Sequence, residues 1–219
     1  MADSEPAASA DAAQAEILVL VAHPELEQSR ANRRLLEAAL ALQQGGSGRV
    51  AVRDLYALYP DYLIDVAAEQ RRLAQAKLVV WQHPIQWYGM PALMKLWVDE
   101  VLAFGWAYGP GGEALRGKDL WLVASTGGPE ASYHPSSYNR YFFDAFLPPY
   151  DQTAALCGMR FAPPLVLHGA HRVDETTLAA HARLYASRLL SHPHWPEIAD
   201  MEPPQDCAVP SEARPEPVA

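Results

Sequence analysis

The residues of this sequence that are best suited to chemistry fall in three short segments, 23–32, 84–88 and 125–128. The first holds a histidine, a serine, an arginine and an asparagine, the second a Trp-Tyr pair, and the third a threonine followed by two glycines. Each segment follows a run of apolar, β-prone residues, so we expect each to begin where a strand ends. They form one site if the fold brings those strand ends to one place.

The first segment offers groups that suit an anion. Ser29 is placed to cap a predicted helix, and Arg30 and Asn32 lie in its first turn. A helix N-terminus presents free N–H groups and the positive end of the helix dipole, which favour a phosphate. The same residues are also compatible with a plain helix cap and, for His23, with a histidine bonded to the backbone at a strand end.

The other two segments suit a flat, aromatic ligand. Trp87 and Tyr88 lie on a short loop before a helix predicted from Pro91 to Phe104, whose apolar residues share one face. In Thr126-Gly127-Gly128, the glycines would let backbone N–H groups approach a ligand closely. Each pattern has a simpler interpretation, because aromatic pairs commonly pack in cores or interfaces and such glycines commonly form turns.

The alternation of β-prone runs and helical patterns predicts an α/β fold with a parallel sheet. We expect strands at 17–22, 49–54, 78–82, 120–124 and 165–168. We expect helices at 29–42, 65–76, 91–104 and 174–190, and at 141–157 around an interruption at Pro148-Pro149. The economical arrangement is a doubly wound five-stranded sheet in the order 2-1-3-4-5, with helices on both faces. Its ligand crevice, at the switch between strands 1 and 3, would bring the three segments together.

The charge distribution predicts one domain with acidic ends. The formal charge is −9, but residues 1–16 hold four acids and no base, and residues 192–219 hold six acids and one base. The body is therefore neutral and unlike a nucleic-acid binder. We expect a disordered extension at 1–15, a domain at 16–191, and a disordered, proline-rich tail at 192–219, where seven prolines occur in 28 residues.

Several classes of protein do not fit the sequence. The longest apolar run, 17–22, is too short to span a membrane, and the acidic N-terminus is unlike a signal peptide. Two cysteines, Cys157 and Cys207, make no disulfide framework and suit the cytoplasm. The spacings typical of a zinc site, a nucleoside-triphosphate loop or a dinucleotide fingerprint are not found.

The three segments together are more specific than any one of them. Ala22-His23-Pro24 with Ser29 and Asn32, then W-Q-H-P-x-Q-W-Y-x-x-P at 81–91, then Thr-Gly-Gly at 126–128, resemble the flavodoxin-like NAD(P)H:quinone oxidoreductase family. The stretches at 55–61, 64–70 and 95–112 are most similar to the bacterial ancillary oxidoreductases of glutathione-regulated potassium-efflux systems. The resemblance covers about 17–190 and neither end of the chain.

The resemblance implies a non-covalently bound FMN. The residues that would hold its phosphate and ribityl chain are His23, Ser29, Arg30, Ala31 and Asn32. The residues that would frame its ring are Ile85, Gln86, Trp87, Tyr88, Ser125, Thr126, Gly127 and Gly128. Tyr133 matches a tyrosine that assists hydride transfer in the wider family, whereas the accompanying histidine position falls on Asn139, and His134 is out of register. The resemblance also implies a homodimer with helix 91–104 at its interface.

The expected activity is the two-electron reduction of a quinone or similar electrophile by NAD(P)H in a ping-pong cycle. One alternative is a regulatory subunit that docks on a potassium/proton antiporter at the inner face of the cell membrane, with its redox activity secondary. Another is an electron carrier of the flavodoxin type, against which the neutral body of the chain and the aromatic loop count. The preference between NADH and NADPH and the physiological acceptor stay open.

Overall fold

The computed structural model describes residues 15–46 and 48–202 of the chain. Within them, parallel strands form a five-stranded sheet in the order β2-β1-β3-β4-β5, as the sequence predicted. The strands are β1 (Ile17–Val21), β2 (Val50–Asp54), β3 (Leu78–Pro84), β4 (Asp119–Ser125) and β5 (Arg160–Leu167). None of the described helices is long and apolar enough to cross a membrane.

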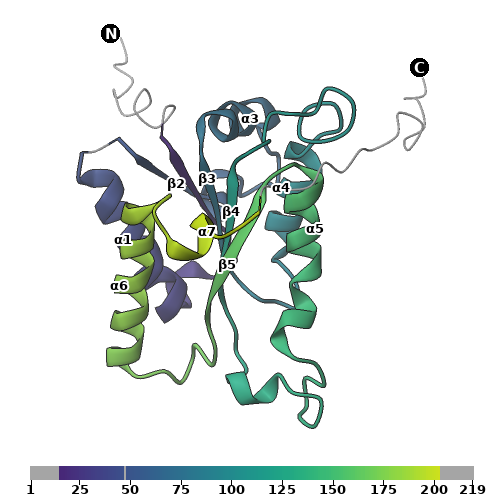
Figure 1. The fold of residues 1–219 in the computed structure, drawn as a ribbon. Helices are drawn as coiled ribbons and strands as arrows, with labels where there is room; N and C mark the ends of the chain where they lie inside the picture. The colour runs from purple at the N-terminus through teal and green to yellow at the C-terminus, as the bar shows by residue number, and fades with distance from the viewer. Residues whose placement is uncertain (1–14, 47, 203–219) are drawn as a thin grey trace.

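The main helices lie in two layers, one on each face of the sheet (Figure 1). One layer consists of α1 (Arg30–Gln44), α6 (Glu175–Ser191) and α7 (Pro196–Ala199). The other consists of α3 (Val66–Gln75), α4 (Ala92–Val101) and α5 (Pro148–Leu156). Shorter helical turns are α2 (Leu55–Leu58), η3 (Leu26–Gln28), η4 (Glu130–Ser132) and η5 (Phe143–Phe146). All five residues of β1 are buried between the layers, which explains why this strand has no polar position.

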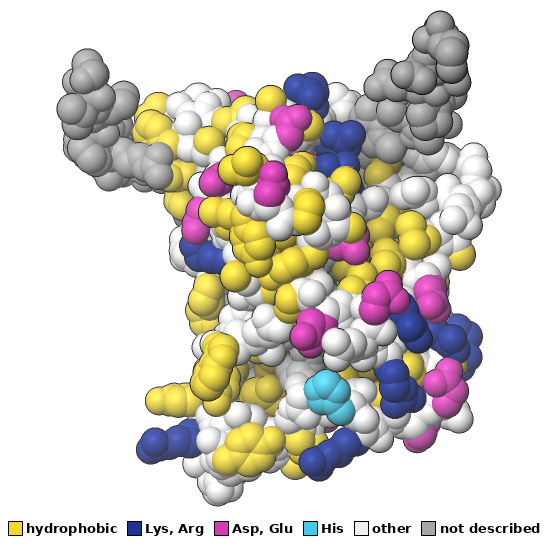
Figure 2. Space-filling model, turned by 180° about the vertical axis from the view of Figure 1, so that it is seen from behind, with side chains coloured by type: hydrophobic (Ala, Val, Ile, Leu, Met, Phe, Trp, Pro, Cys, Tyr) yellow, Lys and Arg dark blue, Asp and Glu magenta, His cyan; other side chains and the backbone are white. Residues whose placement is uncertain are grey.

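The local sequence fixes where α1 begins and which face it buries. The side chain of Ser29 accepts a hydrogen bond from the N–H of Asn32 and so caps the helix. Leu35 and Ala39 lie one helical turn apart and are buried against the sheet. The face seen in Figure 2 accordingly carries charged side chains of both signs on the side where α1 lies. Aspartates cap three further helices in the same way, Asp54 for α2, Asp65 for α3 and Asp174 for α6.

Two proline pairs have roles that differ from the prediction. β5 begins at Arg160 and runs through Pro163 and Pro164, instead of starting at residue 165. This is possible because β5 is an edge strand, where the missing N–H of a proline can face away from the sheet. Pro148 and Pro149 begin α5 instead of interrupting a longer helix, because proline fits the first helical turn.

The apolar face of α4 packs within its own domain. Leu93 and Trp97 are fully buried, and the indole N–H of Trp97 donates a 3.1 Å hydrogen bond to the buried carboxylate of Glu69. The outer face carries an ion pair between Lys95 and Asp99. The apolar residues of the predicted helix 91–104 therefore serve mainly the core of this chain, and the place of this helix at a dimer interface stays a prediction.

The packed chain continues past residue 191. The prediction that residues 192–219 lack regular structure is wrong for 192–202, which contain α7 and the buried side chains of His192, Trp195 and Ile198. The prolines mislead here because Pro196 lies at the start of α7, where proline is tolerated. Residues 1–14 of the predicted extension and residues 203–219 lie outside the described residues.

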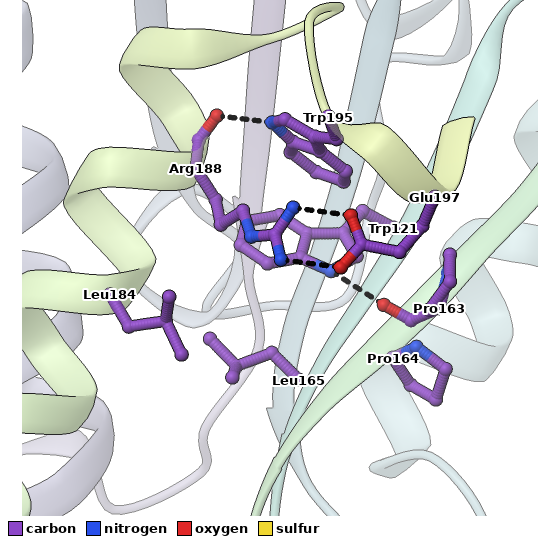
Figure 3. Close-up of a pocket in the computed structure, with 8 residues that line it drawn as sticks. All are labelled: Trp121, Pro163, Pro164, Leu165, Leu184, Arg188, Trp195 and Glu197. Carbon is purple, nitrogen blue, oxygen red and sulfur yellow. Dashed lines mark hydrogen bonds and ion pairs between the residues drawn. The ribbon is translucent and has the colours of Figure 1, made fainter. Parts of the chain in front are cut away.

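Arg188 of α6 attaches α7 to the sheet (Figure 3). Its guanidinium makes two 2.7 Å hydrogen bonds to the carboxylate of Glu197 and lies 5.3 Å from the centroid of the Trp195 ring. These hydrogen bonds lower the pKa of Glu197 to about 2. Trp195 packs edge-on against Trp121 of β4, with 4.8 Å between ring centroids. A cavity of about 140 Å³ lies between this group and the proline pair of β5.

Candidate functional site

A pocket of about 370 Å³ lies at the carboxyl ends of β1, β3 and β4. Its size falls in the range typical of small-molecule sites, and it lies where ligands bind in doubly wound sheets. The predicted site residues that line it are His23, Ser29, Arg30, Ala31, Asn32, Ile85, Gln86, Ser125, Thr126 and Gly127. The three segments picked out by their side chains thus meet in one cavity. Trp87, Tyr88 and Gly128 are not among the residues that line it.

The N-terminus of α1 forms one wall of the pocket. Ser29 caps the helix, but the N–H groups of Arg30 and Ala31 donate no hydrogen bond within the described residues. The guanidinium of Arg30 bonds the carbonyl of Val173 at 3.2 Å and lies 3.5 Å from the carboxylate of Glu175. The wall therefore offers two backbone donors and a cation whose position is set by the start of α6.

Asn32 connects two of the predicted segments beneath the pocket. Its side-chain N–H group donates to the hydroxyls of Ser125 at 2.9 Å and Ser29 at 3.3 Å. Its backbone carbonyl accepts a 3.0 Å hydrogen bond from Gln82 of β3. Its side-chain oxygen is buried and has no hydrogen-bond partner among the described residues. A buried acceptor of this kind is normally satisfied, so it marks a place where a ligand hydroxyl or a water would donate.

Gly127 presents an unpaired backbone donor at the opposite wall of the pocket, and Gly128 follows it outside the pocket lining. Neither N–H donates a hydrogen bond within the described part of the chain. A Cβ atom on Gly128 would lie 2.7 Å from the hydroxyl oxygen of Ser132 and 2.8 Å from that of Tyr138. A Cβ atom on Gly127 would meet nothing closer than His171 at 3.8 Å. A side chain at position 128 would therefore force these neighbours to shift, whereas one at position 127 would meet only His171, which lines the pocket.

Trp87 and Tyr88 occupy a tight turn at the rim. Gln86 and Gly89 exchange backbone hydrogen bonds of 3.0 and 3.1 Å, and the two aromatic residues between them have φ values of 48° and 66°. Left-handed backbone costs roughly 1–2 kcal/mol for each residue with a Cβ atom. The Trp87 side chain is 95% exposed, so packing against the described residues does not offset the strain at this position. Strain of this kind is commonly stored at functional sites.

Tyr133 lies in an aromatic cluster behind the third segment. Its ring packs edge-on against Phe143 at 5.3 Å and Phe146 at 6.1 Å, and Phe146 stacks on Tyr88 at 5.1 Å. Burial raises the pKa of Tyr133, so its hydroxyl is protonated at neutral pH. His134 is exposed and bonds Ser136, away from this cluster.

Five further residues of the pocket were not named as site residues from the sequence, although the first three lie within the segments 23–32 and 84–88. They are Glu25, Gln28, Pro84, Ala170 and His171. Ala170 and His171 follow β5, whose carboxyl end lies at the same edge of the sheet as those of β1, β3 and β4. The rule that ligands bind at strand carboxyl ends would have included them, had it been applied to the last strand as well. Burial lowers the pKa of His23 against the opposing effects of Glu25 and Asp54, and His171 adds a smaller lowering effect.

A family model described as the flavodoxin-like fold matches residues 15–189. The chain belongs to this family. The Citrobacter koseri protein named glutathione-regulated potassium-efflux system ancillary protein KefF is 49% identical over 181 residues, which are 83% of this chain and 97% of that protein. The likeness to these ancillary proteins, predicted from the sequence motifs, is confirmed.

Solved structures of other proteins are also similar to this chain in fold and sequence. General stress protein 14 from Treponema denticola, in complex with FMN, is 36% identical, with a TM-score of 0.73 over 80% of this chain and 98% of that one. An NADPH-quinone reductase from P. pentosaceus is 25% identical, with a TM-score of 0.67 over 78% of this chain and 96% of that one. The predicted likeness to quinone reductases is confirmed as well.

Proposed function

We propose that this flavodoxin-like protein is an FMN-dependent oxidoreductase that transfers two electrons from NAD(P)H to a quinone or a similar electrophile in a ping-pong cycle. The observation that carries the proposal is the set of unpaired polar groups around one pocket: the N–H groups of Arg30, Ala31 and Gly127, and the buried oxygen of Asn32. Relatives that bind FMN or are named quinone reductases support the same kind of chemistry.

These residues fit FMN in type and in order. The N–H groups at the start of α1 suit its phosphate, with His23 and Arg30 beside them. The unpaired oxygen of Asn32 suits a ribityl hydroxyl, which can donate to it. The N–H groups of Gly127 and Gly128 suit the carbonyl and nitrogen acceptors of the ring. The bound flavin would supply the redox chemistry, accepting hydride from NAD(P)H and passing it to the acceptor.

The aromatic rim is proposed to hold the planar partner. Trp87 and Tyr88 would form one side of an apolar slot beside the ring end of the pocket, and Tyr133 would act from the cluster behind it. Because its pKa is raised, Tyr133 would donate a hydrogen bond rather than carry a charge. The acceptor oxygen of a quinone is a suitable recipient for that hydrogen bond.

The absorption spectrum of the purified protein tests the proposal. We expect a yellow protein that releases FMN on denaturation. It should reduce a soluble quinone while NADH or NADPH is oxidised. Double-reciprocal plots at several quinone concentrations should be parallel, as a ping-pong cycle requires. A colourless protein that does not take up added FMN would contradict the proposal.

A homodimer is also proposed, and exposed aromatic side chains offer a face for it in addition to α4, the helix that the resemblance places at the interface. The outer face of α4 is charged, but Tyr138, Tyr141 and Phe142 near the pocket are all more than half exposed, as is Trp87. A second copy of the chain packed against these four aromatic side chains would bury them and enclose the proposed slot beside Trp87 and Tyr88. Sedimentation of the wild-type protein and of a Phe142→Asp variant would test this, because the variant should sediment as a monomer.

A second candidate function is regulation of a potassium/proton antiporter at the inner face of the cell membrane. It is favoured by the 49% identity to a protein named as ancillary to a glutathione-regulated potassium-efflux system. Co-expression with such a transporter distinguishes the two functions. Surface variants that lose activation of efflux and keep quinone reduction would favour regulation, whereas no association and no effect on efflux would count against it.

A further inference from the structure

His168 follows β5 directly and lies between the third segment and the aromatic cluster. Its Nδ1 atom is 3.0 Å from the hydroxyl oxygen of Thr126, a residue that lines the pocket. Its ring centroid is 5.3 Å from that of Tyr133 and 4.9 Å from that of Phe143. Burial lowers the pKa of His168, against an opposing effect of Glu130, so the ring is neutral at pH 7 and carries one proton.

The surrounding hydrogen bonds decide which ring nitrogen carries that proton. The hydroxyl of Thr126 lies 2.8 Å from the carbonyl oxygen of Gly128, which can only accept, and 3.0 Å from His168 Nδ1. If the hydroxyl donated to Nδ1, two acceptor oxygens would face each other at 2.8 Å without a proton between them. Donation to Gly128 instead leaves the Thr126 oxygen to accept from an Nδ1–H group. The neutral ring is then protonated on Nδ1, and Nε2 is unprotonated.

This chain of hydrogen bonds fixes the turn that presents the unpaired donors. The backbone of the turn is already tied to the end of β5, by Thr126 N–H to Leu167 O at 3.0 Å and Gly169 N–H to Gly128 O at 2.8 Å. His168 lies between those two ties and adds a side-chain bond to Thr126. Gly127, between Thr126 and Gly128, has no backbone hydrogen bond of its own among the described residues. Its direction therefore depends on how its two neighbours are held.

We infer that His168 is a positioning residue: its Nδ1–H group holds the Thr126 hydroxyl against Gly128 and so orients the free N–H groups of Gly127, which lines the pocket, and of Gly128, which follows it. The inference rests on the proposed function, since it assigns those donors to the ring of FMN. The ring of Tyr133 also contacts this imidazole. His168 acts through these neighbours and is not among the residues that line the pocket.

Nitrogen NMR on the ¹⁵N-labelled, cofactor-free protein tests the hydrogen-bond assignment without any activity measurement. The His168 ring, identified by its loss in a His168→Asn variant, should show a protonated Nδ1 and an unprotonated Nε2 at pH 7. An unprotonated Nδ1 would overturn the inference.

Two matched substitutions then test the positioning role. Asparagine can place an N–H donor where Nδ1 lies, and glutamine can place one only where Nε2 lies. His168→Asn should therefore bind FMN within about threefold of the wild type, whereas His168→Gln should bind about tenfold more weakly, as loss of one hydrogen bond to a buried hydroxyl predicts. The midpoint potential of the bound flavin should be unchanged in the asparagine variant and lower in the glutamine variant, because the donors aimed at the ring would stabilise its reduced form.

As a control, melting temperatures of the two cofactor-free variants should be close to that of the wild type, which would show that both variants are folded. Equal FMN affinities and equal potentials in the two variants would overturn the positioning role while leaving the proposed function intact. Failure of the wild-type chain to bind FMN would instead refute the proposed function, and this role of His168 with it.

Discussion

At the scale of single residues, Gly127 and Gly128 are neighbours that are needed for different reasons. A Cβ atom at 128 would lie too close to side-chain oxygens, whereas one at 127 would meet only His171, at 3.8 Å. Gly127→Val should therefore leave the melting temperature nearly unchanged and weaken FMN binding by roughly tenfold or more, since it fills the site. Thermal melting measures the first effect, and flavin fluorescence titration measures the second.

The contrasting variant is Gly128→Ala, which should lower the free energy of unfolding by roughly 1–3 kcal/mol through overpacking. Gly45→Ala, at the end of α1 and away from the pocket lining, should change neither property much. If Gly127→Val bound FMN as tightly as Gly45→Ala, the pocket described here would not be the cofactor site.

His83 makes stability depend on pH. It is fully buried at the end of β3, and burial lowers its pKa from 6.5 to about 4. Between pH 4 and pH 6.5, His83 is protonated in the unfolded chain and neutral in the folded one. The free energy of unfolding therefore falls as the pH drops from 6.5 to 4. The full effect is about 3 kcal/mol, at 1.36 kcal/mol for each pKa unit.

Denaturant melts of wild type and His83→Phe, at a series of pH values, should show this difference in slope. The variant should lose less stability than the wild type between pH 6.5 and pH 4, even if it is less stable at pH 7. His134→Phe, which changes an exposed histidine, should follow the wild-type curve. Parallel curves for wild type and His83→Phe would be inconsistent with a buried, neutral His83.

At the scale of elements, the turn from Gln86 to Gly89 carries strain that its own packing does not explain. Trp87 has a φ of 48° and is 95% exposed, and asparagine adopts this backbone conformation more readily than tryptophan. Trp87→Asn should therefore leave the protein as stable or raise its stability by up to about 1 kcal/mol. It should also raise the KM for quinone several-fold, if Trp87 forms the acceptor slot.

Leu63→Asn is the control for the Trp87→Asn variant. Leu63 is also strongly exposed, but it is not among the residues that line the pocket. It should change neither stability nor KM. A Trp87→Asn protein that was strongly destabilised, with normal kinetics in the folded fraction, would show that the tryptophan serves structure rather than ligand binding.

At the scale of the whole molecule, the layer of α1 and α6 is completed by the segment after residue 191. Trp195 is 2% exposed and packs on Trp121 and beneath Arg188. Trp195→Ala should lower the free energy of unfolding by about 3–5 kcal/mol, because a large buried ring leaves a cavity. FMN affinity in the folded protein should stay the same, since the residues around Trp195 and those of the pocket do not overlap.

Glu197→Gln is the matched change at the surface. It removes the ion pair between Glu197 and Arg188. The Glu197 side chain is 43% exposed, and exposed pairs contribute at most about 1 kcal/mol to the free energy of unfolding. Urea unfolding should therefore separate the two variants clearly. Similar, small effects of both substitutions would mean that α7 is peripheral to the stability of the domain.

The sequence by itself determined the sheet, its order and most of the pocket. Continuous apolar runs mark buried parallel strands, and the polar residues that follow them must then meet at one edge of the sheet. Ten of the predicted site residues line the pocket for that reason. Local signals also fixed several helix starts, because the capping side chain and the N–H group that it accepts from are close in sequence, as for Ser29 and Asn32.

Tertiary structure decided what depends on distant neighbours. Whether Pro163 belongs to a strand depends on its being at the sheet edge, and whether Trp195 is buried depends on Trp121 and Arg188. The partnership of His168 with Thr126 joins residues 42 positions apart in the chain. Contacts of this kind leave no periodicity or spacing in the sequence, because they arise only when two strand ends are placed side by side.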